Sequence, residues 1–401
     1  MPEHIIFHID VNSAYLSWTA LTRLKEGSDV DLRLIPSIIG GDMSKRHGIV
    51  LAKSIPAKAY GITTGEPVIN AFRKCPHLVS VPPDHRLYDR MSAMLMEFLS
   101  DVCPDIEQVS IDECYMDYTP IAEKYTSPEA AAAYIKDTVY QKFGFTVNVG
   151  ISDRKVLAKM ASDFKKPNLV HTLYSREIKE KLWPLPVSRL FMCGRSSVET
   201  LKKLGILTIG ELAQADPVIL EAHLKSQGLT LWKYANGKDA SEVFSEPVKL
   251  KGIGNSTTLK EDASTRDEAL KAILWLSESV GSRLRASHQL AGLVCVELKY
   301  HTFRSVSHQM LLETPTASTD MIYRKAQELF DDLWDGTPIR LLGVRTAKLA
   351  EESEPVQLSL FEDLTPVSEK QQKLDAALDN IRKRFGKDAI KRGSLLDSQD
   401  E

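Results

Sequence analysis

Three carboxylates lie in two short apolar contexts about a hundred residues apart. Asp10 ends the run IIFHID, and Asp112 and Glu113 stand together in VSIDECYMDYT. Magnesium prefers oxygen ligands and keeps coordination positions for water or substrate phosphate. Two such ions can stabilise both the attacking and the leaving oxygen of an in-line phosphoryl displacement. The three residues therefore suggest a site for two divalent cations and phosphoryl transfer on a nucleic acid.

Neither context is decisive when it is taken alone. A single Asp after a strand is most often a cap or turn residue, and most adjacent acidic pairs lie on a solvated surface. The alternation of strand side chains would also send Asp112 and Glu113 to opposite faces of a sheet. Both carboxylates can reach one site only if the chain bends or turns between them.

Length and composition limit the class of protein. A chain of 401 residues suggests roughly two to four domains, and its 43% hydrophobic content is ample for more than one core. No apolar stretch reaches membrane-spanning length, and MPEHIIFHIDVNS has no signal-peptide pattern. The five cysteines are odd in number and lack CxxC spacing, which is typical of reduced intracellular proteins. We therefore expect a cytoplasmic protein with no membrane partner and no disulfide framework.

The net charge of −3 does not by itself indicate nucleic-acid binding. The acidic residues are unevenly placed, because residues 351–401 hold 8 Lys and Arg against 12 Asp and Glu. Residues 1–350 therefore carry a net charge of +1. This balance permits a basic groove backed by an acidic outer face.

The residue pattern changes several times along the chain. The N-terminal part mixes β-branched runs with helical stretches, as in an α/β or α+β layer. SPEAAAAYIKDTVYQKFG predicts a helix that Ser127 caps and Gly144 ends. Residues 183–238 favour short helices, two of them joined at a Leu-Gly-Ile turn. A β-α-β-α-β module is predicted at about 250–350, followed by a polar, flexible tail that contains a short amphipathic helix.

Longer strings around the carboxylates carry a family resemblance. The sequence resembles the Y-family DNA polymerases, which are translesion enzymes, in strings that keep the family's order and spacing: HIDVNSAYLSW, RHGIVLAKSIPAKAYGITTGEP, KCPHLVSVPP, EQVSIDECYMDYT and NVGISDRKVLAKMASDFKKPN. The strings LKKLGILTIGELA, VELKYHTFRS and PIRLLGVRTAKL extend the resemblance over roughly residues 4–350.

The resemblance implies an α+β multidomain fold shaped like a right hand. The expected parts are an α/β palm at 1–12 and 78–174, small fingers at 13–77, a helical thumb resembling a helix-hairpin-helix at 175–238, a linker at 239–249, a β-α-β-α-β little finger at 250–350 and an acidic tail at 351–401.

The resemblance also implies roles for the acidic residues. Asp10, Asp112 and Glu113 align with the family's metal-binding carboxylates, and the backbone carbonyl of Val11 aligns with a fourth protein ligand. Together they would bind two Mg²⁺ ions. Asn12 stands where many relatives have a second aspartate, but that position is not among the ligands, so we expect little loss.

Residues for the incoming nucleotide follow in the same way. Tyr15 falls at the steric-gate position, where its ring would exclude a ribose hydroxyl by a repulsive contact. Lys166 matches a lysine that contacts the triphosphate, and a compact ammonium group suits phosphate oxygens. Lys58 aligns with a second triphosphate contact that is usually arginine. The N–H groups of Ser13–Tyr15 could also cradle phosphate if they open a helix.

Two departures concern the grip on the triphosphate. Ile55 replaces a tyrosine that commonly donates its hydroxyl, and Lys58 replaces a bidentate arginine. The loss of two directional donors predicts weaker nucleotide binding or a compensating contact from Ser54 or Lys53.

Duplex DNA would be held through its backbone, independently of sequence. In the thumb, FMCGRSS lacks the first glycine of a regular helix-hairpin-helix turn, near Met192, so its phosphate contact is expected to be weaker. In LKYHTFR, alternation predicts that Lys299, His301 and Phe303 share one face of a strand. Either face could meet DNA.

QLSLF at 357–361 is the other specific signal. It resembles the bacterial sliding-clamp-binding pentapeptide, in which Gln357, Leu358, Leu360 and Phe361 would anchor an extended peptide in an apolar pocket. Large apolar residues in a polar tail usually indicate a partner. The alternative is that the segment docks on its own protein.

The sequence thus predicts a template-directed, error-prone translesion DNA polymerase. It would act as a monomer on primer–template DNA and add dNTPs to the primer 3′ end without proofreading, since no further acidic cluster has exonuclease spacing. Two alternatives stay open. One is a DNA- and clamp-binding accessory protein of the same fold with weakened catalysis, which the intact carboxylates argue against and which Ile55 and Lys58 keep open. The other is a metal-dependent nuclease that uses the same two-ion chemistry.

Overall fold

The computed structural model describes residues 4–41, 48–245, 249–351, 369–386, 389–390 and 392–393. The chain forms two compact units, residues 1–247 and 248–401, and each is described by itself. None of the described helices is both long and apolar enough to cross a membrane. All five cysteines are buried and free.

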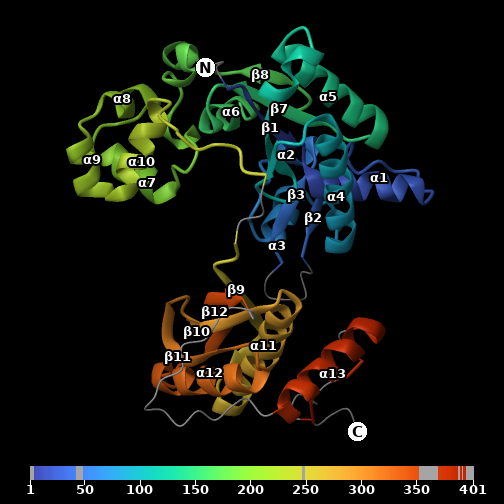
Figure 1. Cartoon of the computed structure of the whole chain (residues 1–401), viewed down its shortest axis with the longest axis vertical. Helices are drawn as coiled ribbons and strands as arrows, with labels where there is room; N and C mark the ends of the chain where they lie inside the picture. The colour runs from blue at the N-terminus through green and yellow to red at the C-terminus, as the bar shows by residue number, and fades with distance from the viewer. Residues whose placement is uncertain are drawn as a thin grey trace. The chain divides into compact units, whose positions relative to one another are not determined.

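The first unit is built on a five-stranded sheet with the order β5-β6-β1-β7-β8 (Figure 1). β1 pairs antiparallel with both β6 and β7, and β8 runs parallel to β7. The strands are β1 (Ile6–Val11), β5 (Ile106–Gln108), β6 (Glu113–Asp117), β7 (Val147–Ser152) and β8 (Val170–Thr172). The helices around them are α1 (Ala14–Lys25), α4 (His85–Val102), η1 (Thr119–Lys124), α5 (Pro128–Phe143) and α6 (Lys155–Ser162).

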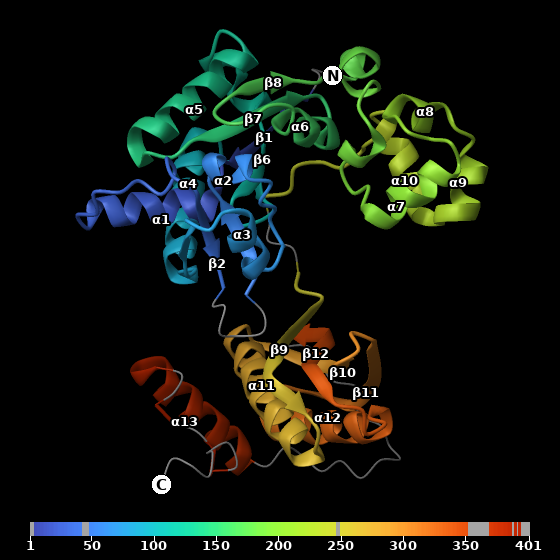
Figure 2. The same cartoon turned by 180° about the vertical axis from the view of Figure 1, so that it is seen from behind.

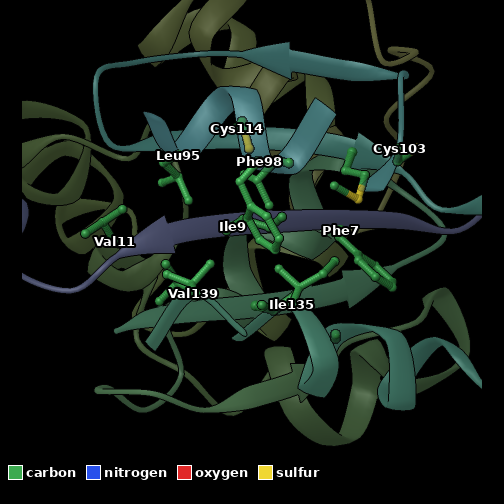
Figure 3. Packing of buried hydrophobic residues seen from close by; sticks show 14 of the residues in the cluster. Phe7, Ile9, Val11, Leu95, Phe98, Cys103, Cys114, Ile135 and Val139 are labelled. Carbon is green, nitrogen blue, oxygen red and sulfur yellow. The ribbon is translucent and has the colours of Figure 1, made fainter. Parts of the chain in front are cut away.

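Alternate residues of β1 face two different environments. Phe7, Ile9 and Val11 lie in the main core, and Figure 3 shows Ile9 between side chains of α4 and α5. His8 and Asp10 lie on the other face, where α6 packs against β1. The strand period of two therefore builds the core with one set of residues and delivers Asp10 to the α6 face with the other.

The helix predicted at 127–144 is confirmed as α5. The Ser127 side chain accepts a hydrogen bond from the N–H of Ala130 and caps the helix. Gly144 ends it in the left-handed region, with φ of 80°. Both ends follow the chemistry that the sequence indicated.

A smaller sheet with the order β3-β2-β4 follows α1 in the chain. β2 pairs antiparallel with β3 and parallel with β4. Its elements are β2 (Ser37–Gly40), β3 (Val50–Lys53), α2 (Ile55–Ala59), α3 (Val68–Lys74) and β4 (Val79–Val81). This layer contains Ile55 and Lys58, which depart from the family pattern, and the candidate compensating residues Lys53 and Ser54. Its last strand ends at Val81, slightly beyond the limit of 77 expected for the fingers.

The C-terminal part of the first unit is helical, and α7 to α10 gather in one cluster (Figure 2). Two helical pieces meet at the predicted Leu-Gly-Ile turn, where Gly205 has φ of 77°. Thr208 and Glu211 then cap the next helix reciprocally. The elements are η2 (Ser175–Glu177), η3 (Ile178–Leu182), η4 (Val187–Arg189), α7 (Arg195–Lys203), α8 (Ile209–Gln214), α9 (Pro217–Leu224) and α10 (Ser226–Ala235).

The second unit is an antiparallel sheet with the order β11-β10-β12-β9, and α11 and α12 cover one face (Figure 1). The element order is β-α-β-β-α-β, one strand more than predicted. β11 was missed because it is an edge strand whose residues are mostly polar and exposed. The elements are β9 (Gly252–Ala263), α11 (Arg266–Ala286), β10 (Gln289–Tyr300), β11 (Ser305–Thr316), α12 (Thr319–Leu333), β12 (Ile339–Glu351) and α13 (Glu369–Phe385).

The predicted common face of Lys299, His301 and Phe303 is wrong. β10 ends at Tyr300, and the chain turns at once into β11. The N–H of Tyr300 donates to the carbonyl of Arg304, and Phe303 is left-handed with φ of 67°. Alternation applies only within a strand, so it does not extend to His301 or Phe303.

Part of the predicted tail is a docked helix. α13 extends the amphipathic helix expected there and lies along α11 (Figure 1). The guanidinium of Arg285 pairs with Asp379 at 2.6 Å, and that of Arg382 pairs with Glu278 at 3.0 Å. The clamp-binding residues Gln357, Leu358, Leu360 and Phe361 lie outside the described residues.

Candidate metal and nucleotide site

Asp10 and Glu113 are directly opposite each other on the antiparallel strands β1 and β6. Cβ atoms of such cross-strand pairs are about 4.5–5.5 Å apart, and their side chains point to the same face. His8 and Tyr115 form the neighbouring pair on that face. Two carboxylates from distant parts of the chain therefore meet under α6.

Asp112 reaches the same region because β6 begins only at Glu113, and residues 110–112 form a bend. The bend that the two adjacent carboxylates required is therefore present. The N–H of Val11 donates to the carbonyl of Asp112 at 3.0 Å and ties the bend to β1. The Ser110 hydroxyl donates to the Asp112 carboxylate at 2.8 Å.

Two lysines of the α6 region place their ammonium groups among these carboxylates. Lys159 Nζ lies 2.5 Å from Glu113 Oε2 and 3.4 Å from Asp10 Oδ2. Lys166 Nζ lies 3.1 Å from Asp10 Oδ1 and 2.8 Å from Asp163 Oδ1. The predicted residue Lys166 is thus next to Asp10. Lys159 is a site residue that the sequence analysis missed.

The donor set fits magnesium in its chemistry. All the ligating groups expected of Asp10, Val11, Asp112 and Glu113 are oxygens, which hard cations prefer. Across the described ranges, however, no three His, Cys, Asp or Glu side chains are arranged as a ready-made metal cluster. The ammonium groups of Lys159 and Lys166 supply the positive charge beside these carboxylates instead.

Asp112, Glu113 and His8 have shifted pKa values. Burial, and then the charges of Asp10 and Glu113, raise the pKa of Asp112. The pKa of Glu113 falls to about 2, chiefly because His8 Nε2 and the Lys159 ammonium group lie beside it, against the effect of burial. Burial lowers the pKa of His8. Asp10 and Glu113 have lysine partners, whereas Asp112 has no positively charged group beside it in the described part of the chain. A bound cation would supply that charge and favour the ionised form of Asp112.

Tyr15 lies in the first turn of α1, directly after β1. Its ring stacks on that of Tyr88 of α4, with centroids 4.1 Å apart, and meets His85 edge-on at 6.2 Å. The backbone N–H groups expected to cradle phosphate lie at the start of helix α1, as that role requires. Ser13 precedes it in a left-handed conformation, with φ of 48°.

Hydrogen bonds in the small sheet distinguish the two proposed compensating residues, Ser54 and Lys53. Ser54 is the N-cap of α2: its hydroxyl accepts from the N–H groups of Ala57 and Ser37 and donates to the carbonyl of Ile35. Its hydrogen-bonding capacity is therefore used, which leaves Lys53. Burial, and then the charge of Lys58, lower the pKa of Lys53.

The side chains of Lys53 and Lys58 therefore lie near enough to repel each other, and neither has an ion pair with another described residue. Ile55 is 64% exposed beside them. At positions 55 and 58, where the resemblance implies a tyrosine and an arginine, this chain has Ile55 and Lys58.

Spacing alone does not identify His8 and Lys159 as site residues. His8 is two residues before Asp10 and must share its face of β1. Lys159 lies within α6, which ends at Ser162, so no helical spacing relates it to Lys166. Both residue types are common in ordinary helices and strands, so only the fold distinguishes them.

Comparisons with known proteins agree over nearly the whole chain. Residues 9–163 match the impB/mucB/samB family, and residues 250–360 match that family's C-terminal domain. DNA polymerase IV of Clostridium acetobutylicum is 45% identical over 397 residues, which cover 99% of each chain. The chain belongs to the Y family of DNA polymerases. DNA polymerase IV of Acetivibrio thermocellus is 36% identical, with 98% of both chains covered.

A solved structure agrees with this Y-family assignment at the level of the fold. A Y-family DNA polymerase chimera of Dbh and Dpo4 aligns with a TM-score of 0.74 at 22% identity. The alignment covers 86% of this chain and 99% of the chimera. The predicted α+β right-hand polymerase fold is confirmed, whereas the exact limits of its parts remain a prediction.

Proposed function

We propose that this Y-family polymerase carries out template-directed nucleotidyl transfer at Asp10, Asp112 and Glu113. The primer 3′-hydroxyl attacks the α-phosphate of a dNTP, a new phosphodiester bond forms, and pyrophosphate leaves. The observation that carries the proposal is the direct pairing of Asp10 with Glu113, with Asp112 tied alongside through Val11. Three carboxylate side chains gathered at one end of a buried sheet suit metal-assisted phosphoryl transfer.

The carboxylates and the carbonyl of Val11 would hold two Mg²⁺ ions. When bound, these ions would stabilise the attacking oxygen and the charge that develops on the leaving group. Lys166 and Lys58 would neutralise the triphosphate by charge. Tyr15, held against Tyr88, would lie against the sugar and exclude ribose.

The wider interactions follow the same family. Primer–template DNA would be held through its backbone by the helical cluster of the first unit and by the second unit. The segment 357–361 would bind a sliding clamp. The protein would work as a cytoplasmic monomer without proofreading, so misinserted bases would persist.

Primer extension with Mg²⁺ tests this proposal. Parent protein should lengthen a primer on a template, whereas Asp112→Ala with Glu113→Ala should not. Asp101→Ala with Glu123→Ala is the matched control, because it removes two exposed carboxylates outside the site and should leave extension unchanged. Equal extension by parent and the Asp112/Glu113 variant would refute the assignment. Shortened primers would indicate a nuclease, and DNA binding without extension an accessory protein.

A further inference from the structure

A buried imidazole touches one of the expected metal ligands. The side chain of His8 is 1% exposed and lies on the same face of β1 as Asp10. Its Nδ1 lies 2.9 Å from the hydroxyl of Ser162, at the end of α6. Its Nε2 lies 3.5 Å from Glu113 Oε2 and makes no hydrogen bond with any described residue. The ring of Tyr115 packs edge-on against it at 4.8 Å.

The surroundings decide which nitrogen carries the proton. The hydroxyl of Ser162 has one proton and two acceptors within reach, His8 Nδ1 and the carbonyl of Lys159 at 2.8 Å. If the Ser162 hydroxyl donated to the carbonyl of Lys159, it could only accept from His8, and a neutral His8 would then carry its proton on Nδ1. The unprotonated Nε2 would face the Glu113 carboxylate with its lone pair. Two acceptors facing each other repel, so the carboxylate favours the tautomer with Nε2–H. A protonated imidazole also carries Nε2–H, so Nε2–H faces Glu113 in both charge states of His8.

Among the residues that the structure describes, both side-chain contacts to the Glu113 carboxylate use the same oxygen. His8 Nε2 and Lys159 Nζ approach Oε2 from different elements, β1 and α6. An oxygen with two neighbouring donors fixes the rotation of its carboxylate and leaves Oε1 as the oxygen for another ligand. Partners that hydrogen-bond a ligating carboxylate typically affect metal affinity by about 10- to 100-fold. The approach distance of 3.5 Å leaves room for this contact to shorten when the carboxylate takes up a cation.

We propose that His8 is a positioning residue for the metal site: its Nε2–H orients Glu113 so that Oε1 faces the cation, and Ser162 supports the tautomer that does so by donating to Nδ1. This inference rests on the proposed role of Glu113 as a metal ligand. It adds a three-residue chain, Ser162–His8–Glu113, that links the end of α6 to the strand pair at the catalytic end of the sheet.

Mn²⁺ binding to the full chain with primer–template tests the inference, with free Mn²⁺ measured by electron paramagnetic resonance. His8→Phe keeps a ring of similar volume without a donor and should weaken Mn²⁺ binding about tenfold. Ser162→Ala, which frees the tautomer, should weaken it by about threefold, a smaller part of the same effect. His8→Gln, which keeps an amide donor, should bind more tightly than His8→Phe. Ser152→Ala removes another buried hydroxyl bond, to the carbonyl of Leu173, and should bind as the parent does.

A second readout separates positioning from general damage. In primer extension, His8→Phe should need about tenfold more Mg²⁺ for half-maximal rate, and its rate should recover at saturating Mg²⁺. A purely structural role would lower the rate at every Mg²⁺ concentration. Thermal unfolding of each variant without metal provides the control for stability.

Unchanged Mn²⁺ affinity in folded His8→Phe would overturn the inference, as would equal weakening by Ser152→Ala. If His8→Phe does not fold, Ser162→Ala decides, and parent-like affinity there overturns it. Asp112→Ala with Glu113→Ala sets the baseline. A parent that binds Mn²⁺ no better than this baseline would refute the metal site and the proposed function, whereas loss of the His8 effect alone would refute only the positioning role.

Discussion

The ring of Tyr15 lies almost parallel to that of Tyr88, with centroids 4.1 Å and planes 7° apart. Tyr88 is fully buried in α4, and its hydroxyl lies 3.1 Å from the hydroxyl of Thr19. The half-exposed ring of Tyr15 therefore rests on a fixed part of the core. Such support suits a residue whose role is to exclude a group by repulsion, because a mobile ring would yield.

Replacing Tyr15 with Ala should relax the choice of sugar. Without the ring, a ribose 2′-hydroxyl meets no clash, and ribonucleotide incorporation should rise at least about tenfold, or about 1.4 kcal/mol of lost discrimination. Single-nucleotide extension with UTP and dTTP measures the ratio. Tyr88→Phe keeps the stacked ring and is expected to retain the parent's preference. Undiminished discrimination in Tyr15→Ala would refute the gate.

The grip on the triphosphate should depend on Lys53 as well as Lys58. Loss of a charge-assisted contact of about 1.5–3 kcal/mol should raise the KM for dNTP at least about tenfold in Lys53→Ala or Lys58→Ala. Steady-state kinetics on a defined template measure it. Lys181→Ala provides the control, because Lys181 of η3 is paired with Glu177. A parent-like KM in Lys53→Ala would leave Lys53 without a role in nucleotide binding.

Restoring the missing hydroxyl at position 55 should tighten dNTP binding. Ile55 is 64% exposed, so a tyrosine there needs no rearrangement of the core. One neutral hydrogen bond contributes about 1 kcal/mol, which predicts a KM about fivefold lower in Ile55→Tyr. The same kinetics measure it. An unaltered or higher KM would contradict the view that the exchange at this position weakens nucleotide binding.

Clamp stimulation should depend on QLSLF. Leu360→Ala with Phe361→Ala removes the two residues expected to fill the apolar pocket, and clamp-stimulated synthesis should fall to the basal rate. Synthesis without a clamp should not change, because these residues lie far along the chain from the catalytic carboxylates. Primer extension with and without a loaded clamp measures both. Stimulation that survives the double change would rule the motif out.

The sequence predicted the local elements well where short-range chemistry sets them. The helix at 127–144 has both of its expected ends, and the Leu-Gly-Ile turn lies between two helices as expected. β11 was missed because most of its residues are polar and exposed, and His308 and Leu311 interrupt the alternation of Val306, Met310 and Leu312. The extent of β10 was overestimated because nothing in LKYHTFR marks the turn that begins after Tyr300.

The site was predictable in part. Asp10, Asp112 and Glu113 carry the family resemblance, and their convergence needed only one bend. His8 and Lys159 acquire their meaning from the packing of α6 on β1, a contact between residues about 150 positions apart. The exclusion of Ser54 likewise required its three hydrogen-bond partners in the small sheet.

The central claim is that the three carboxylates hold two divalent ions during nucleotidyl transfer. Counting Mn²⁺ in a complex of the full chain with a dNTP and a primer that lacks its 3′-hydroxyl tests it most directly, because the reaction cannot proceed. We predict two Mn²⁺ per chain for the parent and fewer for Asp112→Ala with Glu113→Ala. A parent complex with one ion or none, or an undiminished count in the variant, would contradict the claim.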